Sequence, residues 1–234
     1  MRSKKIIFLC FLTLSIAVLP LLCLSTSTQQ CINYNCRTII VPLYLKVLNF
    51  LDRHCNYIRL TNEIIGRESL PQQKVLALLS WTYRNIHKLP DGAEVVDDHV
   101  WNIIIRRFGT NDQSADVFST LCNYAGLSSF YQLISAIDDR EKIPLSFVKI
   151  DKEWHVFDTY HGVYFLNSKN GLASIHDIKK GDCKIAVFVD EGISLFDYRH
   201  YFPNLPDIPV VGLHRANIQS PIRRLKFALE KFAR

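Results

Sequence analysis

In the sequence FGTNDQSADVFSTLCNYAGL, at residues 108–127, the apolar residues recur at helical spacing, and alternation of apolar and polar residues begins where it ends. Gly109 marks a turn, and small and apolar side chains then recur at helical spacing from Asp112 to Tyr124. Gly126 and Leu127 end this segment, and the chain continues in stretches that alternate apolar and polar residues. The stretch is therefore expected to be a helix with one apolar face that leads directly into a β-sheet.

The segments before and after this stretch differ in type. Helices are expected before it, where apolar residues recur at helical spacing in residues 42–60, 69–86 and 98–108. Five strands are expected after it, at residues 130–137, 145–150, 154–157, 163–166 and 185–189. Helices followed by an antiparallel sheet are typical of an α+β domain.

The same segments resemble the transglutaminase-like family, which are papain-related cysteine enzymes. The family pattern is Gly-x-Cys-x-x-x-Ala, a Leu-Cys pair near the end of the helix, and a glycine before a strand. The positions that fall in register with it are Gly109, Ala115, Leu121-Cys122 and Gly126-Leu127. Residues 145–150 and 154–158 resemble the strands that carry the family's histidine and aspartate. The resemblance covers about residues 70–167 and implies a papain/transglutaminase-like fold, with N-terminal helices packed on an antiparallel sheet.

Two of the three catalytic positions of that family are altered in this chain. The resemblance places the nucleophilic cysteine at Asn111, the general-base histidine at Leu145 and the orienting carboxylate at Asp158. An amide is no nucleophile and leucine cannot carry a proton, so the resemblance implies a degenerate triad without ordinary thiol chemistry. Asn111 is then explained as a helix cap. Asp158, with no histidine left to orient, is explained as a cap of the turn toward Gly162.

An active enzyme is the alternative if a different cysteine serves as nucleophile. Cys122 lies eleven residues after Asn111, about 16 Å along the helix, and is expected to be a core cysteine. His155, on a strand face, and His161, expected as a surface binding residue, are the candidate bases. We therefore expect no enzymatic activity. The alternative is a cysteine hydrolase or acyl transferase that uses Cys122 with His155 or His161.

The N-terminus has the form of a secretion signal or membrane anchor. Three cations lie in residues 1–5, and residues 6–24 are an uncharged apolar run that would span about 28 Å as a helix. Cations before such a run place the rest of the chain outside the cytoplasm. We expect one transmembrane or signal helix, and hence a membrane-anchored extracytoplasmic domain, or a secreted protein if the helix is cleaved.

The formal charge of +6 is concentrated at the two ends of the chain. Residues 1–5 carry +3 and residues 220–234 carry +4, which leaves −1 for the remainder. A nearly neutral body argues against a nucleic-acid partner. Residues 221–233 are expected to form a basic amphipathic helix that packs on the domain through an apolar stripe, namely Ile222, Leu225, Leu229 and Phe232.

Seven cysteines are present, and two of them are expected to pair. Cys31 and Cys36 are five residues apart in a segment expected to be exported, where an oxidising compartment permits a disulfide. Cys55 could replace either partner. No close pair of histidines accompanies the cysteines, so neither a metal nor another cofactor is expected.

These features divide the chain into four parts. They are a signal or anchor at 1–30, a Cys-containing helical lead-in at 31–66, a transglutaminase-like domain at 67–200, and a Pro-rich strap with the basic helix at 201–234. A domain that has lost its catalytic residues is expected to retain a cleft that binds a peptide, a glycan or a partner protein. A scaffold subunit of a membrane complex is a further alternative.

Overall fold

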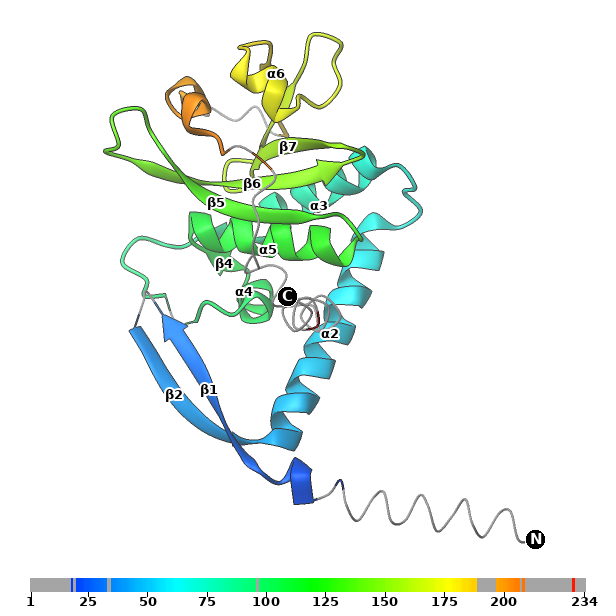
Figure 1. Cartoon of the computed structure of the whole chain (residues 1–234), viewed down its shortest axis with the longest axis vertical. Coiled ribbons are helices and arrows are strands. Elements are labelled where there is room, and N and C mark those ends of the chain that lie inside the picture. Colours follow the sequence, from blue (N-terminus) through cyan, green and yellow to red (C-terminus); the bar gives the residue numbers. More distant parts are fainter. Residues whose placement is uncertain are drawn as a thin grey trace, which may run out of the picture. The chain divides into compact units, whose positions relative to one another are not determined.

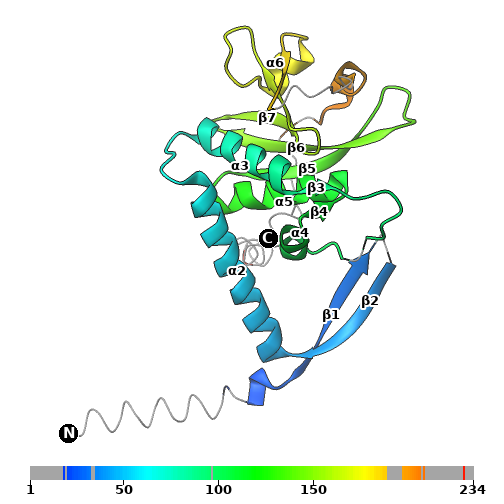
Figure 2. The ribbon, with the colours of Figure 1, turned by 180° about the vertical axis from the view of Figure 1, so that it is seen from behind.

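The computed structural model describes residues 18, 20–32, 35–95, 97–188, 197–206, 208 and 229. The chain forms two compact units, Met1–Cys55 and Asn56–Arg234. The boundary between them falls within the long helix α2 (Leu43–Ile65). Figure 1 and Figure 2 show the elements from opposite sides.

The first unit contains a β-hairpin. Strands β1 (Ser25–Ile32) and β2 (Asn35–Pro42) pair antiparallel along their whole length. Threonine, isoleucine and valine are frequent in this segment, and these β-branched residues favour extended backbone. The backbone N–H of Leu43, where α2 begins, donates to the carbonyl of Leu24 at 2.9 Å. The helical lead-in expected from residue 31 therefore begins only at Leu43, and strand structure precedes it.

The expected membrane anchor at residues 6–24 lies mostly outside the described residues. Within the parts of the chain that the structure describes, no helix is both long enough and apolar enough to cross a membrane. The anchor, and the extracytoplasmic location derived from it, stay predictions.

Cys31 and Cys36 are directly opposite each other in the register of β1 and β2. Cys36 is disulfide-bonded, whereas the free thiols among the described residues are Cys23, Cys55, Cys122 and Cys183. The side chain of Cys31 is outside the described residues, so the Cys31–Cys36 pairing itself stays a prediction.

The second unit is a five-stranded antiparallel sheet between helical layers (Figure 1). Its strand order follows the sequence, as β5 (Ser129–Ser135), β6 (Lys142–Ile150), β7 (Glu153–Asp158), β8 (Val163–Leu166) and β9 (Lys184–Val187). The helices before the sheet are α3 (Pro71–Asn85), α4 (Val100–Arg106) and α5 (Asn111–Tyr124). The α+β class is confirmed, and the helices α3, α4 and α5 precede the five-stranded sheet as expected. A short parallel pair, β3 (His87–Lys88) and β4 (Phe108–Gly109), lies between these helices in sequence and was not expected.

Helix α5 is the central element of this unit. All of its residues from Gln113 to Asn123 are buried, because the sheet covers one side and α3 and α4 cover the rest. Phe118, for example, packs edge-on against Phe157 of β7, with ring centroids 5.5 Å apart. The helix starts at a capping box, in which the backbone N–H of Thr110 donates to Gln113 Oε1 at 3.2 Å. The expected cap at Asn111 is therefore wrong by one residue, because only Thr110 has Gln113 three positions later.

The two faces of the sheet form two separate core clusters. Val148 and Phe157 face α5, whereas their neighbours Phe147 and Val156 belong to the cluster on the opposite face, as the alternation of side chains along a strand requires. Residues of this second cluster also come from the short helix α6 (Ile175–Lys179) and the 3-10 turns η1 (Tyr198–His200) and η2 (Phe202–Asn204).

The start of the Pro-rich segment is more ordered than the expected extended strap. Tyr201 and Leu205 are both buried on either side of the turn η2, and burial of these apolar anchors folds the segment against the sheet. The expected helix at 221–233 lies outside the described residues except for Leu229, which is helical and 61% exposed. The expected packing of that side chain on the domain is therefore not found.

We expect Cys31 and Cys36 to be recovered as one cross-linked peptide when the protein is digested without reduction, because opposite positions of a hairpin bring two cysteines within bonding range. Replacing both by serine should lower the free energy of unfolding by about 2 kcal/mol, since the closed loop is short. Mass mapping with and without reductant measures the link, and the Cys183 peptide serves as the unchanged control. Two free thiols in freshly exported protein would contradict the pairing.

Candidate functional site

The carboxylate of Asp158, at the end of β7, is the centre of a buried polar cluster. Its Oδ1 accepts hydrogen bonds from the backbone N–H of Tyr160 at 3.1 Å and of His161 at 3.2 Å. Its Oδ2 accepts from Nδ1 of His161 at 2.8 Å and from the hydroxyl of Tyr198 at 2.7 Å. Asp158 thus caps the turn between β7 and β8, as expected, and also holds two side chains in place.

His161 and Tyr198 approach this carboxylate from different directions. Tyr198 comes from η1 and is buried, and its burial together with the nearby Asp158 raises its pKa well above the ordinary range. Its hydroxyl therefore stays protonated and donates. His161 comes from the turn itself, and its side chain is 28% exposed. The expectation that Asp158 has no histidine to orient is wrong, because the turn folds His161 back onto it.

Aromatic rings and a lysine surround the same turn. Lys88 Nζ lies 4.9 Å from the ring centroid of Tyr160, and the rings of Tyr160 and His161 meet edge-on at 5.2 Å. Partial burial, with the charges of Asp91 and Asp158, raises the pKa of Tyr160. The position of His161 is therefore fixed by ring packing as well as by its hydrogen bond.

The three positions matched to the family triad do not form a catalytic arrangement. Asn111 is the exposed first residue of α5, and its Oδ1 accepts from the backbone N–H of Asp112 at 2.8 Å. Leu145 is fully buried in the second core cluster, among side chains that include Phe147 and Tyr198. Of the three, only Asp158 carries a carboxylate, and Tyr198, His161 and the turn already engage it.

The alternative nucleophile Cys122 lies in the other core cluster. It is fully buried on α5 with Phe118 and Val148, and burial raises the pKa of its thiol well above the usual value. His155 is 5% exposed, its Nδ1 lies 3.0 Å from the carbonyl of Ala173, and burial lowers its pKa. The structure therefore brings His161 to Asp158, but it places Cys122 in an apolar cluster rather than beside that pair.

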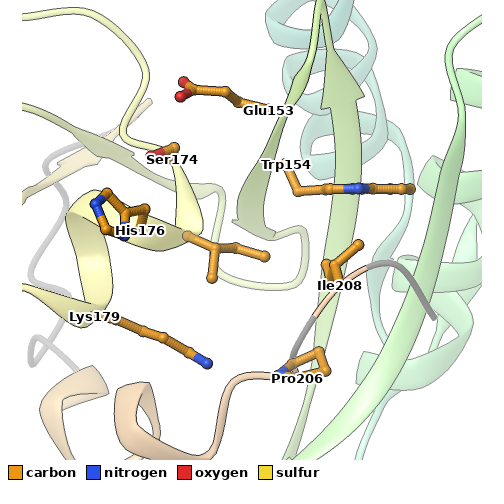
Figure 3. Close-up of a pocket in the computed structure, with 8 residues that line it drawn as sticks. Glu153, Trp154, Ser174, His176, Lys179, Pro206 and Ile208 are labelled. Atoms are coloured by element: carbon orange, nitrogen blue, oxygen red, sulfur yellow. The ribbon is translucent and has the colours of Figure 1, made fainter.

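A pocket of about 290 Å³ opens between the start of β7 and α6 (Figure 3). Its lining combines acidic, basic and apolar side chains: Glu153, Trp154, Ser174, Ile175, His176, Lys179, Pro206 and Ile208. Figure 3 shows the carboxylate of Glu153 and the ammonium of Lys179 on opposite sides of the opening. The opening therefore has a carboxylate on one side and an ammonium on the other.

The local structure of α6 positions two of these side chains. Ser174 caps the helix, since its hydroxyl accepts from the backbone N–H of Asp177 at 3.3 Å, and Asp177 Oδ2 accepts from the backbone N–H of Ser174 at 2.9 Å. This cap directs His176 and Lys179 to the pocket. Sequence reasoning missed the pocket because its lining comes from three separate segments, although the Ser-x-x-Asp pattern at 174–177 signals the start of the helix.

Within the described residues, no group of three or more His, Cys, Asp or Glu side chains is arranged to hold a metal ion. The histidine at 161 is instead bonded to a carboxylate, and His155 faces a backbone carbonyl.

Solved structures with partly similar folds are proteases and a transglutaminase by description. A candidate cysteine protease from Cytophaga hutchinsonii is 19% identical and matches 61% of this chain and 51% of its own, with a TM-score of 0.38. A transglutaminase (TGase) is 12% identical, with coverage of 57% and 43% and a TM-score of 0.38. A candidate protease from Parabacteroides distasonis is 10% identical, with coverage of 57% and 35% and a TM-score of 0.38.

The chain thus spans about half, or less, of the length of these structures. No protein-family model matches the sequence, and no curated protein matches it. The descriptions of these structures name the same classes of protein that the sequence resembles. At such identities and TM-scores the likeness carries no argument about the family of this chain or about its catalytic residues.

We expect Gly162→Ala to destabilise the protein more than Gly126→Ala. Both glycines have positive φ, +65° and +83°, but an added Cβ at residue 162 would lie 2.9 Å from the ring of Tyr83, and at residue 126 it would meet nothing within 4 Å. Left-handed backbone costs about 1 kcal/mol in either variant, and crowding adds about 1–3 kcal/mol at Gly162 only. Denaturant unfolding of both variants measures the difference. Equal losses would show that Tyr83 does not restrain this turn.

Proposed function

We propose that this chain is a non-catalytic binding module of transglutaminase-like fold, exported and held at the membrane by residues 6–24. The observation that carries the proposal is the burial of Leu145, the residue that the sequence resemblance matches to the family's general base. Asn111 offers no nucleophile at the start of α5, and Asp158 serves the turn, His161 and Tyr198. Export is supported by the basic residues before the apolar run.

The pocket between β7 and α6 is the proposed binding site. Pockets that bind ligands combine apolar walls with a few polar groups that fix orientation, and this one has Ile175, Pro206 and Ile208 beside the charged Glu153 and Lys179. Its volume of about 290 Å³ is suited to one or two side chains rather than to a large cofactor.

The geometry favours a peptide segment of a partner protein over a glycan. A sugar ring binds by stacking on an open aromatic face, but the ring of Trp154 extends away from His176 and Lys179 (Figure 3) and packs edge-on against Phe130 at 5.3 Å. An extended peptide with one basic and one acidic side chain can instead pair with Glu153 and Lys179 across the opening, while its apolar atoms contact Ile208.

We expect charge reversal in the pocket to change which peptides bind. The probes are fluorescein-labelled hexapeptides with varied charge, titrated against the full-length protein in detergent and followed by anisotropy. Peptides that carry an acidic side chain should bind Lys179→Glu about ten-fold more weakly than the unmodified protein, since one charge-assisted hydrogen bond contributes about 1.5 kcal/mol.

The matched control is Lys169→Glu, which changes another exposed lysine, in the turn after β8, that does not line the pocket. It should leave binding unchanged. Equal effects of the two variants would contradict a site at α6, as would the lack of any bound peptide.

A second candidate function, a hydrolase or acyl transferase, is favoured by one observation. The hydrogen bond of 2.8 Å between Asp158 and His161 has the geometry by which a carboxylate orients a catalytic histidine. Nε2 is the ring nitrogen through which His161 could meet a substrate. The alternative requires Cys122 to become a thiolate near that nitrogen, and its complete burial opposes this.

We expect Cys122 to react slowly with iodoacetamide in the folded protein and rapidly in denaturant, because burial excludes the reagent and raises the pKa of the thiol. Quantitative mass spectrometry of the peptide that contains Cys122 measures the rate. A cysteine placed in an exposed turn by Ser168→Cys is the control for reagent activity. Fast native labelling of Cys122 would favour the enzyme and overturn the non-catalytic module.

A further inference from the structure

Helix α2 presents an exposed apolar stripe in the first unit of the chain. Tyr44, Leu48 and Leu51 are 40%, 57% and 48% exposed, and Cys55 is an exposed free thiol on the same helix. The helix buries other residues, Tyr57 and Thr61, which at 100° per residue lie about 200–240° around the helix from Cys55. The stripe is therefore not the side that this helix uses for the core.

The spacing of the stripe is that of a coiled-coil seam. Leu48 follows Tyr44 by four residues, Leu51 follows Leu48 by three, and Cys55 follows Leu51 by four. Apolar residues that alternate steps of four and three form a straight seam along a helix, and such a seam packs against a similar helix by inserting side chains between those of its partner.

We infer that this stripe is the contact between two copies of the chain, with their α2 helices parallel and in register. The orientation follows from where the N-terminal segment ends, and it rests on the proposed anchor. The apolar run stops at Leu24, whose carbonyl accepts from the backbone N–H of Leu43 at 2.9 Å. Two copies anchored in one bilayer therefore begin their α2 helices at the same height above the membrane.

Cys55 provides a second observation that agrees with this partner. An exposed free cysteine in an exported chain indicates pairing between molecules or a reactive thiol. Cys23 and Cys55 are both exposed and free, and of these two only Cys55 lies on the stripe. In a parallel pair in register, Cys55 of one copy lies opposite the Cys55 of the other. In such a two-fold dimer the same stripe of each copy faces the other, so no stripe is left exposed to bind a third copy.

The test is oxidative cross-linking of the full-length protein in membranes, with dissolved oxygen as oxidant and copper phenanthroline as catalyst. Each Cys55 thiol gives up one proton and one electron, oxygen is reduced, and the two sulfurs join. Non-reducing electrophoresis should show a band of twice the monomer mass that disappears with reductant and with Cys55→Ser. Leu48→Glu combined with Leu51→Glu should reduce the dimer band at least ten-fold, because like charges would face each other across the seam.

Two control variants separate the seam from general effects. Asn49→Glu adds charge on another side of α2, and Ile40→Glu removes an apolar side chain that is 74% exposed on β2. Both should leave the dimer band unchanged. With Cys55→Ser as background, Leu51→Cys should restore cross-linking and Asn49→Cys should not.

Cross-links that form equally at Leu51→Cys and Asn49→Cys would overturn the dimer, because they would reflect random collisions. A monomer in which a fluorophore on Cys55 is quenched by lipid-borne quenchers would also overturn it, and would assign the stripe to the bilayer surface. Membrane extraction at high pH tests the anchor separately. A Cys55-linked dimer found in the soluble fraction would support the dimer contact through the stripe and would contradict the proposed membrane anchor.

Discussion

The buried carboxylate of Asp158 joins separate parts of the second unit through its hydrogen bonds. An ionised side chain removed from water costs several kcal/mol unless donors replace the lost hydration, and Asp158 receives donors from two backbone amides, His161 and Tyr198. Tyr198 follows Asp158 by 40 residues. Their hydrogen bond therefore joins the end of β7 to the turn η1, which contributes Tyr198 to the second core cluster. This requirement of folding accounts for the hydrogen bonds of Asp158, including the one from His161.

The same segment also accounts for the burial of Leu145, the position that the sequence resemblance matches to a general base. Leu145 lies on β6, a strand buried on both faces, and it shares a cluster with Tyr198, the residue that donates to Asp158. Phe130 and Phe147 stack in this cluster at 4.9 Å, which fills the space with aromatic rings. An imidazole at residue 145 would have to lose its hydration among these rings. The aromatic packing around residue 145 therefore favours an apolar side chain there.

The sequence predicted those parts of the fold that depend on local periodicity. Helix α5 and all five strands follow from apolar spacing of three to four or of two, and the buried Cys122 follows from its place on the helix. The hairpin at Ser25–Pro42 was not predicted from the sequence. Its β-branched residues favour strands, but the preceding apolar run and the two cysteines indicated an anchor followed by a disulfide loop. The partners of Asp158 were missed because Tyr198 is remote in sequence and His161 reaches the carboxylate only through the geometry of a turn. The pocket at α6 combines three segments, and no local pattern reveals such a set.

The proposed pocket and the proposed α2 contact lie in different units of the chain. The second can nevertheless strengthen binding at the first. A pocket of about 290 Å³ with two charged groups would bind a short peptide weakly. A dimer formed through α2 would contain two such pockets, and anchoring would confine both to a surface. A partner with two matching segments then binds its second pocket at a high effective concentration, which can strengthen overall binding by about 10²–10⁴-fold without any new contact. A weak pocket is therefore sufficient for a membrane-bound module that recognises repeated or paired segments, and a single soluble copy would release them quickly.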